Sequence, residues 1–275
     1  RYNTANNNSQ SGLKIKNNAS AVLVEGNTFS SNNVGIHLVL GGSLNMWCDD
    51  QLISATTISS NTGGAIFIEK GGIANLCNLT LNVSTNGIGV YNNSTLNISN
   101  SSLTSSSKRV IYSRGGVAID IDNTTITGNS SKEAVQLNDG SNFQIKGSTV
   151  SGGKTGISAV YNSTVRLQGG NTITGNTQIG IYLLNSTLHQ YSDAGTTTIS
   201  SNTGSEIKAE RSFLNLDGVT ITGTGGSTEV DLKYGSLLML GSGSSVTGTV
   251  TCGNTAPDNG TFVNNSGTTV TTSGC

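Results

Sequence analysis

The chain has 275 residues, of which 11% are charged and 5% are aromatic, and its formal net charge at pH 7 is -1. The near-neutral balance without a basic run argues against nucleic acid and anionic membranes as partners, and no apolar stretch reaches the roughly 20 residues of a membrane span. Asn, Ser, Thr and 37 Gly dominate the composition. This bias is typical of disordered chains, but disorder predicts no apolar period.

The first ten residues, RYNTANNNSQ, are polar and carry no apolar pattern. We expect residues 1–10 to be an N-terminal tail that docks on another subunit, because such a segment frays unless something binds it. Residues 11–275 then form the folded domain. The chain starts at Arg1 without a signal-like segment, which fits a processed mature protein or an excised fragment.

A phrase of Thr, an apolar residue and Ser or Thr recurs along the chain, as in TISSN from Thr57, TITGN from Thr125 and TISSN from Thr198. Its apolar residue, in these and looser copies, lies at Phe29, Ile58, Leu81, Leu103, Ile126, Val150, Ile173, Ile199, Ile221 and Val246. The nine intervals span 246 - 29 = 217 residues, so the mean period is about 24 residues.

Two further apolar series have the same spacing. The first apolar residue after each turn lies at Ile36, Ile66, Ile88, Ile111, Val135, Ile157, Ile181, Ile207 and Val230. The third series is Val22, Leu44, Ala74, Leu96, Ile119, Phe143, Val165, Leu188, Leu214 and Leu238. Three interleaved series with one period indicate three short strands in every repeat.

A repeat of this length indicates a solenoid, because a propeller blade needs four strands and about 40 residues. The sequence therefore predicts an all-β, single-domain parallel β-helix of about 10–11 rungs, each with three short strands. Ile, Val and Leu would fill a stacked core while Thr and Ser face outward. Five asparagines share one corner and predict a broken asparagine ladder that satisfies turn backbone groups. They are Asn32, Asn61, Asn129, Asn176 and Asn202.

The four cysteines form two pairs that are separated by about one repeat. The separations are 77 - 48 = 29 for Cys48 and Cys77, and 275 - 252 = 23 for Cys252 and Cys275. Strands stacked about 4.8 Å apart lie within reach of a disulfide, so we expect both pairs to be bridged; four free buried thiols are the alternative. Two bridges would place the protein outside the cell, secreted or on a cell surface, and the second would close the C-terminal end.

Some of these repeats resemble those of a known family. The copies are Phe29-Ser30-Ser31-Asn32, the tetrapeptide Gly63-Gly64-Ala65-Ile66, and the Ile-X-X-Asn units that begin at Ile58, Ile126, Ile173 and Ile199. They resemble the FxxN and GGAI repeats of polymorphic outer-membrane proteins and related surface adhesins, and the chain more broadly resembles the pectate-lyase-like right-handed β-helix superfamily. The resemblance covers roughly residues 11–250 and implies a right-handed coil, as does the crossover rule for parallel strands.

Because that superfamily includes polysaccharide lyases and hydrolases, we searched the outward positions for carboxylates beside a base. Asp120, Asp122, Lys146 and Arg166 form the most enzyme-like group. An ordinary cross-strand ion pair of Asp122 with Lys146 explains them better, and the Asn-Thr-Asp and Gly-His-Gly motifs of polygalacturonases are missing. The sequence predicts no catalytic residue, no cofactor and no metal site.

Outward aromatic residues can stack on sugar rings. We expect Arg166, Tyr182, His189 and Tyr191 to share a strip near the segment HQYSDAG, where the repeat lengthens to 199 - 173 = 26 residues. A second irregular segment, MWCDDQLISA, holds the single Trp, and loops between rungs are where binding residues concentrate. Asn-X-Ser/Thr triplets are also frequent, at outward or corner positions able to carry glycan.

We therefore expect a non-enzymatic extracellular structural or adhesive β-helix, which self-associates head to tail as the subunit of a surface filament and contacts surface glycans. The alternative is a polysaccharide-binding or polysaccharide-degrading β-helix enzyme of the tailspike kind.

Overall fold

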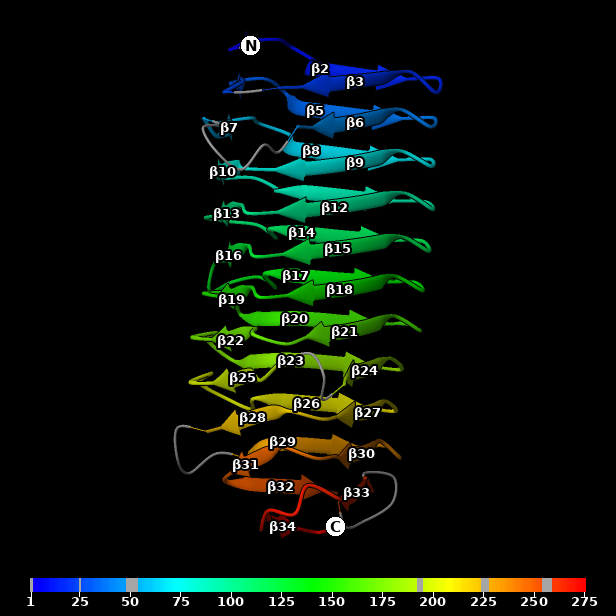
Figure 1. The fold of residues 1–275 in the computed structure, drawn as a ribbon, viewed down its shortest axis with the longest axis vertical. Helices are drawn as coiled ribbons and strands as arrows, with labels where there is room; N and C mark the ends of the chain where they lie inside the picture. Colours follow the sequence, from blue (N-terminus) through cyan, green and yellow to red (C-terminus); the bar gives the residue numbers. More distant parts are fainter. Residues whose placement is uncertain (1, 25, 48–53, 192–194, 224–227, 254–258) are drawn as a thin grey trace.

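The computed structural model describes residues 2–24, 26–47, 54–191, 195–223, 228–253 and 259–275. The chain is a parallel β-helix with the N-terminus at one end and the C-terminus at the other (Figure 1). Its strands build three sheets of 11, 12 and 11 strands. No helix long and apolar enough to cross a membrane occurs in the described ranges.

Each rung contributes one strand to each sheet, and every strand pairs in parallel with its equivalent one rung away. Sheet A consists of β1 (Thr4–Asn6), β4 (Thr28–Ser30), β7 (Thr56–Ser59), β10 (Leu79–Val83), β13 (Ser102–Ser105), β16 (Thr125–Thr127), β19 (Thr149–Ser151), β22 (Thr172–Thr174), β25 (Thr197–Ser200), β28 (Val219–Thr222) and β31 (Ser245–Thr247). Sheet B consists of β2 (Ser11–Lys16), β5 (Val34–Val39), β8 (Gly64–Glu69), β11 (Ile88–Tyr91), β14 (Ile111–Arg114), β17 (Val135–Asn138), β20 (Thr155–Val160), β23 (Ile179–Leu184), β26 (Ile207–Glu210), β29 (Thr228–Lys233), β32 (Thr249–Cys252) and β34 (Thr271–Ser273). Sheet C consists of β3 (Ser20–Leu23), β6 (Ser43–Met46), β9 (Ile73–Cys77), β12 (Thr95–Ser99), β15 (Ala118–Asp122), β18 (Asn142–Lys146), β21 (Thr164–Gln168), β24 (Thr187–Gln190), β27 (Phe213–Leu216), β30 (Leu237–Leu240) and β33 (Thr261–Asn264).

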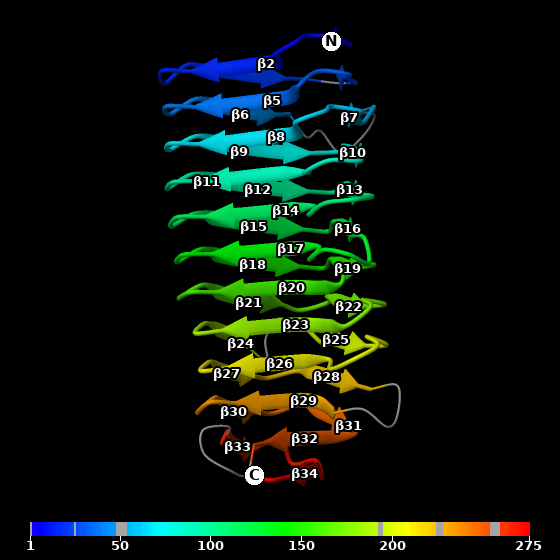
Figure 2. The same cartoon turned by 180° about the vertical axis from the view of Figure 1, so that it is seen from behind.

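Sheets B and C run in opposite directions along the two long sides of each rung, and sheet A lies at its short end (Figures 1 and 2). The core is the apolar space that the three sheets enclose. Its side chains stack in register along the axis, as Ile126 on Val150 and Val150 on Ile173, all with 0% exposure. This confirms the first two apolar series and the predicted architecture.

The third series is confirmed from Leu44 onward, but its first member is wrong. Ala21, not Val22, pairs with Leu44, and Val22 is 57% exposed on the outer face. All four residues from Ala21 to Val24 are apolar, so no alternation of apolar and polar residues indicates which side chains point inward.

Part of the segment that we predicted to be an N-terminal tail is a strand of the rod. Strand β1 pairs with β4 through Thr4 with Thr28, Ala5 with Phe29 and Asn6 with Ser30. Thr4, Ala5 and Asn6 occupy the outward, inward and outward positions of an ordinary rung strand. The inward residue is an alanine, so the sequence shows no large apolar residue there. The boundary that we placed at residue 11 therefore falls inside the first rung.

The corner between sheets A and B contains an asparagine ladder in two segments. Asn202 Oδ1 accepts hydrogen bonds from the backbone nitrogen of Asn176 at 3.0 Å and from its side-chain nitrogen at 2.8 Å. The amide occupies space that a glycine leaves free, since a Cβ on Gly180 would lie 2.7 Å from Asn202 Nδ2. In the other segment, Asn8 makes the same two bonds to Asn32 Oδ1, and the backbone nitrogen of Asn32 donates to Asn61 Oδ1.

Asn129 does not belong to this ladder. Its side-chain nitrogen donates to the carbonyl of Lys108 at 2.6 Å, and its oxygen accepts from the backbone and hydroxyl of Ser131. The rung therefore has an Asn turn on its surface. In the preceding rung, Val110 occupies the position that is equivalent to Gly180, and its fully buried side chain stands where the other segments leave room for an amide.

The corner between sheets B and C repeats a three-residue turn. In Asn162-Ser163-Thr164, the asparagine has φ +61°, the serine hydroxyl donates to the carbonyl of Val160 at 2.8 Å, and the threonine begins β21. Two more turns have the same pattern, and their residues are Asn93-Ser94-Thr95 and Asn185-Ser186-Thr187. Asparagine tolerates the left-handed conformation better than most side chains.

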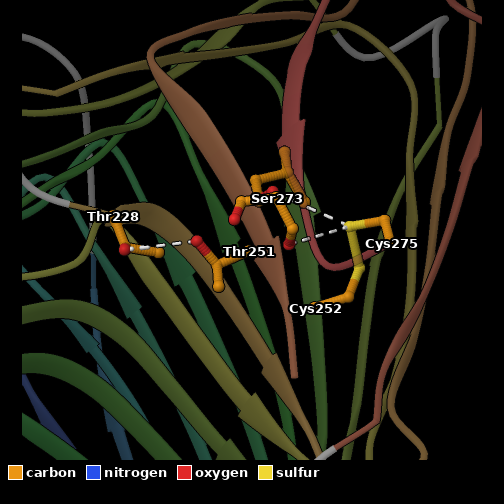
Figure 3. The surroundings of a disulfide bond; sticks show 6 residues. Thr228, Thr251, Cys252, Ser273 and Cys275 are labelled. Carbon is orange, nitrogen blue, oxygen red and sulfur yellow. Dashed lines mark hydrogen bonds between the residues drawn. A yellow bond between two sulfur atoms is a disulfide. The ribbon is translucent and has the colours of Figure 1, made fainter. Parts of the chain in front are cut away.

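Cys252 and Cys275 form the predicted disulfide, with an S–S distance of 2.08 Å and Cα atoms 4.7 Å apart (Figure 3). The bridge joins the end of β32 to the segment after β34, the next strand in sheet B. Cys77 is buried at the end of β9. Cys48 lies outside the described residues, so the pairing of Cys48 with Cys77 stays a prediction.

Candidate functional site

A polar groove of about 350 Å³ lies on the outer face of sheet C. Its polar lining comes from four consecutive strands, β12, β15, β18 and β21, and consists of Asn97, Asp120, Asn142, Gln144, Thr164 and Arg166. A smaller depression of about 200 Å³ continues it toward β9, where Asn75, Ser99 and Asp122 contribute. The face is therefore hollowed along the rod axis over five rungs.

The middle of this face is a column of outward side chains that hydrogen-bond along the axis. Asn75 Nδ2 donates to Asn45 Oδ1 at 2.5 Å, and Asn97 Nδ2 donates to Asn75 Oδ1 at 2.6 Å. Gln144 Nε2 donates to Asp120 Oδ2 at 3.3 Å. We call Asn45, Asn75, Asn97, Asp120, Gln144, Arg166, His189 and Asn215, which pair in register, the polar column.

The enzyme-like group has the register that the sequence predicts. Asp120 pairs with Gln144 and then Arg166, and Asp122 pairs with Lys146. All four charged side chains are exposed, and within the described residues Asp122 and Lys146 form no ion pair although they are neighbours in the sheet. What the arrangement offers is a line of hydrogen-bond donors and acceptors with a carboxylate and a guanidinium two rungs apart.

Arg166 and His189 are neighbours in sheet C, as β21 pairs with β24. The His189 ring lies parallel to the Tyr191 ring, with centroids 6.3 Å apart, and meets Phe213 edge-on at 5.8 Å. Burial lowers the pKa of His189, and the nearby charge of Arg166 lowers it further. Its Nδ1 atom is buried without a hydrogen-bond partner among the described residues, whereas Tyr191 is 50% exposed.

Tyr182 does not share this strip. It belongs to β23 in sheet B, where its neighbour is Lys208, whose Nζ lies 5.9 Å from the ring centroid. Burial raises the pKa of Tyr182, and the charge of Glu210 adds to the effect. Tyr182 and His189 are only seven positions apart in sequence, but β23 and β24 belong to different sheets, which form the two long sides of the rod (Figure 1). Our predicted site thus separates into Arg166, His189 and Tyr191 on sheet C and Tyr182 on sheet B.

Sheet B carries an aromatic column that the sequence interpretation did not identify. The rings of His37, Phe67, Tyr91 and Tyr112 follow one another with centroid distances of 6.5, 6.3 and 5.8 Å. Arg109 lies 5.5 Å from the Tyr112 centroid. Gly89 makes this column continuous because a Cβ there would lie 2.6 Å from the Tyr91 ring and 3.0 Å from Phe67. The sequence feature that could have indicated this column is a glycine, Gly89, two positions before an aromatic residue, Tyr91.

A third hollow, of about 500 Å³, lies at the corner between sheets B and C. Its lining consists of Tyr161, Asn162, Asn185, Ser186, Thr187, Arg211 and Phe213. Tyr161 and Arg211 have φ values of +56° and +49°. A bulky residue in this conformation is uncommon, and at this corner Leu40, Lys70 and Tyr234 share it.

No group of three or more His, Cys, Asp or Glu side chains that could hold a metal ion occurs in the part of the chain that the structure describes. The buried carboxylates that it contains, Glu206 and Glu229, accept hydrogen bonds from backbone and amide nitrogens. Their lone pairs are therefore directed at donors within the protein.

Comparison with known proteins gave one family match. The profile of the right handed beta helix region matches residues 86–275, more than half of the chain. No curated protein and no solved structure matches the chain significantly. The parallel strand order, the three sheets and the stacked core agree with that description, and the chain is a member of the right-handed β-helix family.

Proposed function

We propose that this β-helix is a non-enzymatic extracellular structural or adhesive rod that binds a glycan along the outer face of sheet C. The observation that carries the proposal is the polar column beside the groove on sheet C. Amide, carboxylate and guanidinium groups repeat there at the spacing of the rungs, about 4.8 Å. A polymer with hydroxyl groups along its length could contact several rungs at once.

The composition of the groove supports binding through orientation rather than through burial. Polar side chains form a line, and Tyr191 offers an exposed ring beside His189, the neighbour of Arg166 in the sheet. Polar groups that fix a sugar's orientation, together with an aromatic surface, are the usual features of carbohydrate recognition. The Cys252–Cys275 disulfide supports an oxidising, extracellular setting.

Binding to a panel of neutral and anionic polysaccharides, by immobilised-glycan array followed by calorimetry, tests the proposal. Arg166→Ala should weaken the interaction roughly tenfold or more, because a hydrogen bond to a charged group contributes about 1.5–3 kcal/mol. Arg114→Ala is the matched control, since Arg114 is an exposed arginine on sheet B that pairs with Asp139. An unchanged affinity in Arg166→Ala, or an equal loss in both variants, would contradict the site.

The same preparations separate binding from degradation. Each polysaccharide that binds is incubated with the protein, and new reducing or unsaturated ends are measured over time. Non-enzymatic binding predicts no increase over buffer. An increase that is abolished in Asp120→Asn, with binding retained, would establish the alternative of a polysaccharide-degrading enzyme.

We also propose that the rod self-associates end to end with a second copy. The support is that, in the part of the chain that the structure describes, β1, β2 and β3 each pair with a strand on one side only, and that Leu13, Ala21 and Leu23 of this rung are only partly buried. Because β1 belongs to the rod, the contact would use strand edges and not a flexible tail. Sedimentation velocity at increasing concentration should show growing species; a constant monomer mass would contradict the contact.

A further inference from the structure

Two fully buried carboxylates lie one rung apart near the C-terminal end of the rod. Glu206 is 0% exposed and Glu229 is 2% exposed. Each precedes an inward core residue of sheet B, and these residues, Ile207 and Val230, pair in register. The two carboxylates therefore stack along the axis at the same corner as the asparagine ladder.

Glu206 takes the role that an asparagine has elsewhere in this ladder. The backbone nitrogen of Asn202 donates to Glu206 Oε1 at 3.2 Å, and its side-chain nitrogen donates to Oε2. Asn176 makes the corresponding two bonds to Asn202. The next rung has no asparagine at this corner, since residues 222–227 read TGTGGS. The glutamate thus reaches in from its own rung to fill the empty place.

Glu229 is held in a similar way. Its carboxylate accepts a hydrogen bond from the backbone nitrogen of Thr249, the first residue of β32. Gly223 and Gly248 enclose it, and a Cβ on either glycine would collide with the carboxylate. Backbone atoms and missing side chains therefore form the pocket, which makes the carboxylate a fixed part of the corner.

The surroundings of the pair contain no compensating cation among the described residues. The charged groups on the strands that carry it, Lys208, Glu210, Asp231 and Lys233, pair with one another on the outer face of sheet B. On the neighbouring strands, Gly180 of β23 precedes the partner of Ile207, and Thr249 of β32 pairs with Thr228 beside an irregularity in register at Glu229. Residues 224–227 include no titratable side chain. Burial raises the pKa of Glu206, and the charge of Glu229 raises it further, whereas the bonds from Asn202 act in the opposite direction.

We propose that this carboxylate pair makes the rungs from β25 to β32 a pH-responsive part of the rod, closed while the pair holds a proton and loosened once both groups are ionised. Two buried like charges one strand spacing apart repel each other in a medium that screens them poorly. Opening of the corner hydrates both carboxylates. In the earlier rungs where this ladder is formed, amides of Asn32, Asn61 and Asn176 occupy the corner and carry no charge.

The direction of the pH effect follows from the pKa of Glu206. The pKa of Glu206 is raised above its ordinary value of 4.5, so the folded corner binds a proton more tightly than the open one. Its contribution to stability is present below pH 4.5, and it is lost as the pH rises through the pKa of the folded state. The open state should therefore gain population toward neutral and alkaline pH, and acid should close the corner.

Hydrogen exchange of the intact protein, followed by mass spectrometry between pH 5 and pH 8, tests the proposal. Protection factors, which correct for the intrinsic pH dependence of exchange, are compared for peptides covering β26, β29 and β32 and for peptides covering β17 and β20. We expect protection of the first group to fall by up to about tenfold per pH unit for each proton released. Protection of the second group should not change.

Glu206→Gln and Glu229→Gln keep an acceptor oxygen and remove the charge, so each should flatten the pH dependence of the first group. Glu210→Gln is the matched control, because Glu210 lies on the same strand and faces outward beside Lys208. Equal pH dependence in both groups of wild-type peptides would overturn the proposal, and so would a slope in both glutamine variants identical to that of the wild type. The wild-type comparison decides even if a glutamine variant fails to fold.

Discussion

The side-chain oxygen of Asn61 accepts the backbone N–H of Asn32 at 2.8 Å, one rung away, and both residues are 1% exposed. Asn61 also donates from Nδ2 to the carbonyl of Phe29 at 3.0 Å. One amide therefore satisfies a donor and an acceptor of the preceding turn, neither of which water can reach.

Replacing Asn61 with Ala should lower the free energy of unfolding by about 1–3 kcal/mol, because it leaves buried backbone groups without partners. Asn97→Ala is the control, since that amide belongs to the exposed polar column. Urea denaturation followed by circular dichroism measures both. Equal losses in the two variants would mean that the buried amides of the ladder contribute no more to the free energy of unfolding than exposed ones do.

Ile173→Asp should prevent folding. Ile173 is 0% exposed and stacks between Val150 and Ile199, so the carboxylate would be an unpaired charge in a dry core. Thr174→Asp, on the outward side of the same strand, should fold normally. Soluble yield and the circular dichroism spectrum distinguish the two outcomes, and a fully ordered Ile173→Asp protein would refute the stacked core.

Peptide mapping under non-reducing conditions should recover Cys252 linked to Cys275. Cys275→Ser should cost roughly 3 kcal/mol on the chain-entropy estimate for a loop of this length. The loss should be confined to the last rungs, because each rung contacts only its neighbours. Hydrogen exchange localises it: increased exchange in β8 or β11 as well would contradict the nearest-neighbour description.

Titration of His189 by NMR, in a His37→Gln background that leaves one imidazole, should give a pKa below the ordinary value of 6.5. Arg166→Ala should raise that pKa without restoring the ordinary value, because burial is the larger cause. The neutral ring is favoured in the folded state, so its contribution to stability is complete above pH 6.5 and is lost as the pH falls through the folded pKa. An unchanged pKa in Arg166→Ala would show that the guanidinium is not near the ring.

The fold could be predicted from the sequence because its strongest signal is a repeated one. Ile126, Ile173 and Ile199 occupy equivalent places in phrases with the same turn residues, so each copy supports the register of the others. The first rung has a neighbour on one side only, and its apolar alternation is ambiguous at Val22. The sequence interpretation is wrong at that position for this reason.

The site was harder to predict because side chains that are close in sequence can leave the rod on different sides. Tyr182 and His189 are seven positions apart, yet a turn between β23 and β24 sends one to sheet B and the other to sheet C. By contrast, the stack of Asp120, Gln144 and Arg166 follows from the period alone. The sequence did not indicate that Glu206 is buried. The glutamate occupies its place in the ladder only because the next rung has no asparagine there, and the apolar period does not show this.

The turn between sheets B and C has a consequence for glycosylation. In Asn162-Ser163-Thr164 the first residue supplies the left-handed conformation, the second caps a carbonyl inside the corner, and the third starts a strand. Residues that meet these three requirements also form Asn-X-Ser/Thr, the acceptor triplet of N-linked glycans. The architecture of the corner is sufficient to produce the triplets that begin at Asn93, Asn162 and Asn185, so the presence of these three reflects the turns of the rod and carries no information about how many sugars are attached.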